Sequence, residues 1–261
     1  MSPLFEDSSE TKQVSFFFGE KNAFRLLSAE FFGRILRRSE LFGLCGAPRS
    51  STLHVGTVDA EIYIEFLETE RIGMMGAYRL RSESDGLCLI IDSALIFQAD
   101  CRGCGIGFAA FQRQVHRARH LGFRKIRADT ERKQNENGHY TWPRFGFDAP
   151  LPSPFLHRLP VFLHGAASVL DVMEFPAGRI WWKEHGIGLS LQFDLRRFSR
   201  SMTVFLAYSR RRRTRSRVSI VIDGAERDNS PEQPPVSVTE ATTGPPNRTG
   251  RLVAAAAPRF R

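Results

Sequence analysis

Apolar residues change their spacing near residue 105, and this change separates two kinds of predicted element. Segments rich in β-branched and aromatic residues predict strands over 53–67, 72–81 and 87–97. Turn residues at 83–86 separate the last two strands, which are therefore expected to be antiparallel neighbours. From 105 to 121 the apolar residues recur at helical spacing instead, and Gly122 is expected to end that helix.

Both patterns return further along the chain. The spacing predicts a strand, a short helix and the start of another strand over 123–130, 135–144 and 145–149. Prolines then mark a break over 150–154, and helical patterns follow over 166–175 and 178–185. Residues 189–195 alternate apolar and polar side chains, as a strand with one buried face does, so we expect this strand to complete the sheet.

These elements predict an α/β (α+β) fold in which helices flank a mixed, mostly antiparallel sheet. The predicted domain spans 51–208, with a core at 53–149, a helical insertion at about 155–186 and a final strand at about 187–196. Residues 1–50 are expected to form an N-terminal helical extension, because apolar residues within them have helical spacing. Residues 209–261 lack periodicity, which predicts a basic, disordered tail.

Composition and charge narrow the class of protein. Hydrophobic residues make up 42% of the 261 residues, and Phe occurs 22 times, so the chain can bury a substantial core. The net charge is +9, but residues 209–261 hold eleven Arg against five acidic residues and thus carry +6 of it. A nucleic-acid or acidic partner is therefore expected only through the run from Arg210 to Arg217.

The sequence also favours a soluble, cytoplasmic protein with no membrane partner. Acidic residues precede the first apolar cluster, which is the wrong charge order for a secretory signal peptide. The longest apolar run, 87–97, is interrupted by Asp92 and is shorter than the roughly 20 residues that span a bilayer. Four cysteines in a chain of this size do not make a disulfide framework, so a reducing compartment is expected.

The segment from Arg102 to Gly107 joins a predicted strand to the amphipathic helix. Gly103, Gly105 and Gly107 permit unusual backbone conformations and let a ligand approach the main chain closely. The first N–H groups of a helix have no partner inside it and lie at the positive end of its dipole, so they bind anions. Arg102 adds a positive charge. The sequence therefore predicts a pyrophosphate site at this turn.

Two other interpretations of this segment fit less well. A Rossmann dinucleotide site would need a third glycine at Ala110 and parallel strands before it, whereas the preceding strands are expected to be antiparallel. Cys101-x-x-Cys104 followed by His116-x-x-x-His120 comes close to a zinc-finger spacing, but eleven residues separate Cys104 from His116, where about twelve are usual. The glycines in between suit a phosphate loop better, so no metal site is predicted.

Two motifs resemble those of the GNAT N-acyltransferase superfamily. The turn at 102–107 reads Arg-x-x-Gly-x-Gly and resembles the coenzyme A pyrophosphate motif of that family. Residues 135–147 read Asn-x-x-Gly-x-x-x-Trp-x-x-x-Gly-Phe and are similar to a later motif, in which Tyr usually stands where this chain has Trp142. The resemblance covers 53–149, and the strand near 189–195 would be the family's last strand, displaced by an insertion.

By this resemblance the chain would bind acetyl-CoA as a cosubstrate. The backbone of Ile96 and Phe97 would pair with the pantetheine arm, which would fill a gap between two splayed strands, and Asn135 would contact the arm further along. The pyrophosphate would be held by residues of the turn, namely Arg102, Gly103, Cys104, Gly105, Ile106 and Gly107.

The resemblance further implies transfer of an acetyl or other acyl group from acetyl-CoA to an amine. In such enzymes the amine attacks the thioester directly, without a covalent enzyme intermediate. The family's Tyr protonates the leaving thiolate, but the indole of Trp142 does not give up its proton. Asp92, as a base, and Tyr140, two residues from Trp142, are the catalytic candidates. The alternative is a noncatalytic GNAT-like module that binds coenzyme A or a protein; the acceptor and the oligomeric state stay open.

Overall fold

A computed structural model of the protein describes residues 13–17, 20–48, 50–69, 73–96, 98–101, 103–131 and 137–225. The chain divides into two compact units, Met1–Ser216 and Arg217–Arg261. The sheet, the helices that pack on it and the cleft described below all belong to the first unit. Of the second unit, the described part is the end of a helix that stops at Ala225.

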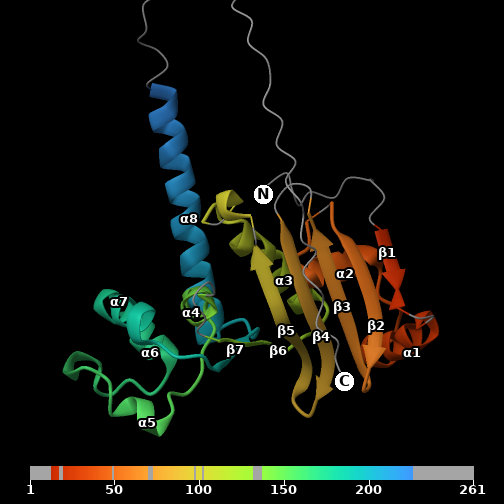
Figure 1. The fold of residues 1–261 in the computed structure, drawn as a ribbon, viewed down its shortest axis with the longest axis horizontal. Coiled ribbons are helices and arrows are strands. Elements are labelled where there is room, and N and C mark those ends of the chain that lie inside the picture. Colours follow the sequence, from red (N-terminus) through yellow and green to blue (C-terminus); the bar gives the residue numbers. More distant parts are fainter. Residues whose placement is uncertain are drawn as a thin grey trace, which may run out of the picture. The chain divides into compact units, whose positions relative to one another are not determined.

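Within the described residues, seven strands form one mixed sheet and lie in it in the order of the sequence (Figure 1). The strands are β1 (Gln13–Phe16), β2 (Thr52–Val58), β3 (Glu61–Glu68), β4 (Met74–Glu83), β5 (Gly86–Ile96), β6 (Lys125–Asp129) and β7 (Ser190–Asp194). β1 pairs with β2 and β5 with β6 in parallel, and the other neighbours are antiparallel. The predicted mixed, mostly antiparallel sheet is confirmed, and the strand predicted at 189–195 completes it as β7.

Some helices pack on the sheet, and others are inserted in the chain before the last strand. They are α1 (Lys21–Phe32), α2 (Arg38–Cys45), α3 (Ile106–His120), α4 (Gly138–Phe145), α5 (Ser153–Leu156), α6 (Val169–Glu174), α7 (Pro176–His185) and α8 (Arg200–Ala225). α1 contacts β2 and β3, while α2 contacts β3, β4 and α3. α5, α6 and α7 lie between β6 and β7 in the chain, and α4 contacts both α6 and α7 (Figure 1). The predicted helical insertion before the last strand is therefore confirmed.

An aromatic cluster fixes α3 in the domain. Phe111, on α3, is 1% exposed and packs against Phe145, Phe147 and Phe193 at ring-centroid distances of 5.7, 5.3 and 5.4 Å. Each buried Phe side chain contributes about 1.5–3 kcal/mol to folding. These rings come from α4, from the segment after it and from β7. The cluster therefore holds the beginning of α3 in a fixed place beside the end of β5.

The N-terminal helices are part of the domain and not an extension of it. β1 pairs with β2, and Phe42 and Leu44, both on α2, are 0% exposed. The prediction of a domain boundary at residue 50 is wrong for this reason. An amphipathic helix needs an apolar partner, and for α1 and α2 that partner is a sheet whose strands come later in the chain.

The segment predicted as one strand over 53–67 is a hairpin of β2 and β3. Asp59 and Ala60 join the strands with φ angles of 49° and 60°. Two-residue hairpin turns of this kind need a positive φ at both central positions and usually carry Gly at one of them. Glycine is absent from this turn, so no local signal marks it.

Two other segments also differ from the prediction. Residues 145–149 form an isolated bridge between Asp148 and Gln192 instead of the start of a strand, because Gly146 ends α4 and Pro150 lacks an N–H group to pair. Residues 209–225, predicted to be disordered, continue α8. Arg is a good helix former, and the first 24 residues of this helix contain neither Gly nor Pro. Residues 226–261 lie outside the described part of the chain.

Candidate functional site

Strands β5 and β6 run in parallel and then part. They pair as far as Ile91 and Ala128. β5 then continues to Ile96, whereas β6 ends at Asp129. On its other side β5 shifts register against β4, which leaves Asp92 as the extra residue of a β-bulge and bends the strand locally. The gap between splayed strands that the family resemblance implies is thus present.

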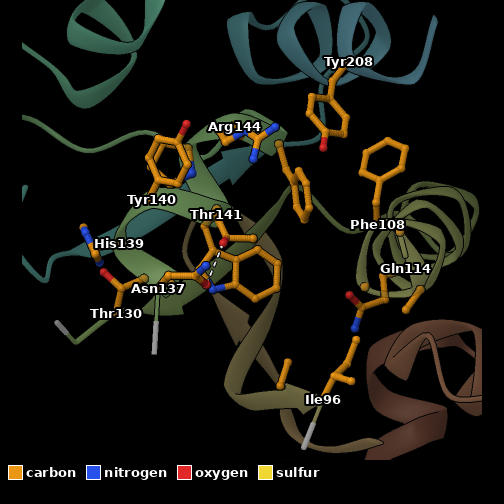
Figure 2. A pocket seen from close by; sticks show the side chains of 18 of the residues that line it. Ile96, Phe108, Gln114, Thr130, Asn137, His139, Tyr140, Thr141, Arg144 and Tyr208 are labelled. Atoms are coloured by element: carbon orange, nitrogen blue, oxygen red, sulfur yellow. Dashed lines mark hydrogen bonds between the residues drawn. The ribbon is translucent and has the colours of Figure 1, made fainter. Parts of the chain in front are cut away.

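A cleft of about 1910 Å³ opens where the strands part. It is lined by the end of β5, the first turns of α3, the end of β6 and parts of α4, α6, α7 and α8. Figure 2 shows several of the side chains in its wall, among them Phe108 and Gln114 from α3, Arg144 from α4 and Tyr208 from α8. Pockets for single small ligands measure about 300–1,000 Å³, so this cleft is larger than such a pocket.

The turn before α3 presents backbone N–H groups to the cleft. Gly103 and Gly105 have φ angles of 78° and 88°, which residues with a side chain rarely adopt. No side chain caps the helix, and the N–H groups of Gly105, Ile106 and Gly107 donate no hydrogen bond to any residue that the structure describes. All of these residues line the cleft. The first turn of α3 therefore leaves its donors available to an anion.

The cofactor residues predicted from the sequence fall into three groups. Those that line the cleft are Ile96, Gly103, Gly105, Ile106 and Gly107. Cys104 is exposed on the turn and does not belong to the cleft wall; its Sγ donates to the carbonyl oxygen of Asp100 at 3.3 Å. Phe97, Arg102 and Asn135 lie outside the described residues.

Asp92 lies at the cleft, but its carboxylate is held by Arg79. Nε and Nη2 of Arg79 donate to it at 2.8 and 2.6 Å, and this interaction is the main cause that raises the pKa of Arg79. Arg79 also donates to Glu61 at 3.2 Å. A carboxylate whose two oxygens already accept hydrogen bonds from a guanidinium is less accessible to an amine in the cleft. This geometry disfavours Asp92 as a base.

The α4 position at which the family usually has Tyr serves packing in this chain. The ring centroid of Trp142 lies 5.7 Å from that of Phe111 and 5.0 Å from that of Phe147. Tyr140 lines the cleft, and the guanidinium of Arg144 lies 5.3 Å from the centroid of its ring, at cation–π distance. Trp142 has an indole, whereas Tyr140 has a phenol that could donate a proton in the cleft.

A second phenol enters the cleft from α8. The ring of Tyr208 packs on Phe108 with 4.8 Å between centroids, and the Arg144 guanidinium lies 5.5 Å from it. Figure 2 shows the hydroxyl end of Tyr208 directed into the space between Arg144 and Phe108. The sequence-based prediction includes Tyr208 in the domain but does not name it as a site residue. Helical spacing between Phe205 and Tyr208 is the signal that could have found it.

Gln114 places a buried amide in the wall of the cleft. The residue is 3% exposed, and its Nε2 atom has no hydrogen-bond partner among the described residues. Figure 2 shows the side chain extending from α3 toward Ile96. Tyr78 lies in the same wall, and burial raises the pKa of its phenol. A buried donor without an acceptor costs about 1–3 kcal/mol, so this position suits a ligand with a carbonyl oxygen.

α8 also brings arginines to the beginning of α3. Arg211 and Arg212 line the cleft, and the guanidinium of Arg212 lies so close to Gly105 that a Cβ atom there would overlap it. These two residues belong to the segment predicted to be disordered, but they lie in α8, where Arg211 is exposed and Arg212 is partly buried. They follow Tyr208 by three and four positions, which places them on the side of α8 that packs on α3.

Within the described ranges, no group of three or more His, Cys, Asp or Glu side chains is placed to hold a metal ion. No helix in this part of the chain combines the length and the apolar character needed to cross a bilayer.

A mixed sheet that parts between two parallel strands, followed by a helix with an open N-terminus, defines a GNAT-like fold. Residues 32–147 match the model of the acetyltransferase (GNAT) family. This part of the chain is therefore similar to the acetyltransferase (GNAT) family. The match begins at the last residue of α1 and therefore includes α2.

Among the solved structures that are similar to this chain is Arabidopsis thaliana Naa50 in complex with the bisubstrate analogue CoA-Ac-MVNAL. The two are 15% identical, the likeness covers 50% of this chain and 78% of that chain, and the TM-score is 0.28. A likeness at this level does not extend to shared substrates. No curated protein matches the sequence.

Proposed function

We propose that the protein transfers an acetyl group from acetyl-CoA to an amine of an acceptor molecule. The observation that carries this proposal is the open first turn of α3, where the N–H groups of Gly105, Ile106 and Gly107 lie beside the cleft and have no acceptor among the described residues. Hydrogen bonds to a charged acceptor contribute about 1.5–3 kcal/mol each, so a few of them are enough to hold a pyrophosphate. The match of residues 32–147 to the acetyltransferase (GNAT) family supports coenzyme A as the source of that pyrophosphate.

The rest of the cosubstrate would lie along the gap between β5 and β6. The pantetheine arm would pair with the backbone near Ile96, and the amide of Gln114 offers a donor for one of its carbonyl oxygens. Phe97, Arg102 and Asn135 remain proposed contacts because of the motifs that they belong to. We also propose a cytoplasmic location, because four cysteines that form no disulfide suit a reducing compartment.

In the proposed reaction the protein mainly positions the amine against the thioester and assists proton transfer. The amine nitrogen attacks the thioester carbon, the carbon–sulfur bond breaks, and the proton that the nitrogen loses ends on the thiolate or on water. A thiolate whose conjugate thiol has a pKa of about 8.5 is a tolerable leaving group. Tyr140 and Tyr208 are two of the phenols that line the cleft, and they are our candidates for the group that donates a proton to the thiolate.

A noncatalytic module that binds coenzyme A is the second candidate. The observation that favours it is the packing of Trp142 at the position of the family's acid. In this case the cleft would bind the cosubstrate through the same turn and gap, and no acyl group would be transferred.

Gly107→Glu tests the cosubstrate site. A Cβ at Gly107 would meet only the Ile96 side chain at 3.8 Å, and the residue does not have a positive φ, so the substitution adds negative charge to the turn without backbone strain. We expect acetyl-CoA to raise the Tm of the wild type but not that of Gly107→Glu. His116→Glu is the matched control, because it adds the same charge at an exposed position of α3 away from the turn; its Tm should rise as in the wild type.

Absence of any Tm shift in the wild type at saturating acetyl-CoA would refute both candidate functions. Thiol release from acetyl-CoA in the presence of a panel of amines distinguishes between them. Release that depends on an added amine supports the transferase, whereas a Tm shift without release supports the noncatalytic module.

A further inference from the structure

Aromatic packing determines where the arginines of α8 lie. Phe205 and Tyr208 pack on Phe108, with ring centroids 5.6 and 4.8 Å away. Arg212 follows Tyr208 by four residues, which is about one turn of helix, so both side chains leave α8 on the same side. The contact that anchors α8 on the first turns of α3 therefore also directs Arg212 toward the turn at Gly105.

The guanidinium of Arg212 fills the space directly above Gly105, and only the missing side chain of glycine admits it there. Among the described residues, neither Arg211 nor Arg212 forms an ion pair with a carboxylate. A guanidinium beside the positive end of a helix is electrostatically unfavourable unless an anion lies between them. The N–H groups of Ile106 and Gly107 also have no acceptor in the described structure. Among the described residues, the guanidinium of Arg212 and the N–H groups of this turn therefore both lack an anionic partner.

We infer that Arg212 binds the diphosphate of the cosubstrate together with the first turn of α3, so that the C-terminal helix forms part of the cosubstrate site. This inference rests on the proposed function, because it takes coenzyme A as the ligand. The diphosphate is the group concerned because Arg212 adjoins the N–H groups that would hold it. A guanidinium offers two parallel N–H donors to phosphate oxygens. The buried Nε2 atom of Gln114, which has no hydrogen-bond partner among the described residues, is an independent sign that this cleft receives a polar ligand.

The test compares Arg212→Gln with Arg210→Gln in the full-length protein. Arg210 is the matched control because it lies on the same helix, is exposed and does not belong to the cleft wall. Calorimetric titration would measure the Kd for coenzyme A, for 3′-dephospho-coenzyme A and for S-acetylpantetheine, which has no diphosphate. We expect Arg212→Gln to weaken both diphosphate ligands roughly 10- to 100-fold, as loss of a charged hydrogen-bond pair does. Binding of S-acetylpantetheine should not change, and Arg210→Gln should stay within about twofold of the wild type for every ligand.

Each other outcome has a distinct meaning. Coenzyme A that fails to bind the wild type refutes the proposed function itself. Binding to the wild type that Arg212→Gln leaves unchanged refutes the inference and leaves the proposed function intact. Tighter binding by Arg212→Gln also refutes the inference, because it shows that the guanidinium occupies the place of the ligand. A loss restricted to ligands with a 3′-phosphate would assign Arg212 to that phosphate and overturn the assignment to the diphosphate. The Tm of each variant without ligand verifies that it is folded.

Discussion

Helices α6 and α3 begin in opposite ways. At α6 the carboxylate of Asp171 accepts hydrogen bonds from the N–H groups of Ala167 and Ser168 at 2.9 and 2.8 Å, and Arg200 pairs with the same carboxylate at 2.5 Å. α3 begins after Gly105 without any side-chain cap, although an arginine lies beside it as well. The start of α6 contains N–H donors, an anion and an arginine. The start of α3 contains the donors and the arginine, and the place of the anion opens to the cleft.

This difference separates a helix end that serves stability from one that serves binding. Ser168 and Asp171 form a capping box, which satisfies N–H groups from within the chain and stabilises the helix by about 1 kcal/mol. α3 does without that stabilisation, and Phe111 in the aromatic cluster holds it in place instead. A helix whose packing secures it can leave its first turn to a ligand.

Supplying α3 with its own anion should have the largest effect. In Gly107→Asp a carboxylate lies in the first helical turn, where the helix dipole favours it by about 0.3–1 kcal/mol. We expect the affinity for acetyl-CoA to fall about 100-fold or more, because the carboxylate repels the diphosphate and competes for the same donors. The Tm without ligand should stay the same or rise. Titration calorimetry and a thermal melt measure the two effects, and an unchanged Kd would show that this turn is not the binding site.

Removing the anion from α6 should affect stability alone. Asp171→Ala leaves two N–H groups and Arg200 without their acceptor, so we expect the free energy of unfolding to fall by about 1.5–3 kcal/mol. The Kd for acetyl-CoA should not change. Urea denaturation of both proteins measures the first quantity. Weaker cosubstrate binding in a variant that remains folded would mean that the two helix ends are coupled.

The contribution of Asp171 should also depend on pH. Burial raises the pKa of Asp171, but hydrogen bonds from Arg200 and from the N–H groups of Ala167 and Ser168 outweigh it and lower the pKa below its usual value of 3.8. The stabilisation is therefore fully present above the pKa of the unfolded chain and is lost as the pH falls through the lowered folded pKa. Denaturation at neutral pH and at several values below pH 4 should show the difference between wild type and Asp171→Ala narrowing with acid. A constant difference would contradict this account.

Ser168→Ala should have the smallest effect. The Ser168 hydroxyl accepts from the N–H of Asp171 at 3.4 Å, a long hydrogen bond, while the Asp171 carboxylate still satisfies two other donors. We expect a loss of about 0.5–1 kcal/mol in the free energy of unfolding and no change in cosubstrate binding. A loss as large as that of Asp171→Ala would assign the cap to the hydroxyl and not to the carboxylate.

The sequence predicts those parts of the site that depend on neighbouring residues. The glycine turn before α3 and the alternation that forms β7 are local patterns, and both were found on that basis. Gln114 and Arg212 take part in the cleft through contacts between segments far apart in the chain, which spacing along one segment does not contain. Asp92 shows the same limit, since its pairing with Arg79 depends on the register of two strands.

The parting of β5 and β6 gives the sheet two inner edges in addition to its outer ones. Strand edges recruit extended chains, and on the outside of a protein they promote aggregation. Here the inner edges belong to neighbouring strands and border the cleft, so a flexible linear ligand can add to them while the folded surface of another molecule is kept away. Near the bulge at Asp92, the domain thus keeps backbone groups available for pairing without exposing them to aggregation.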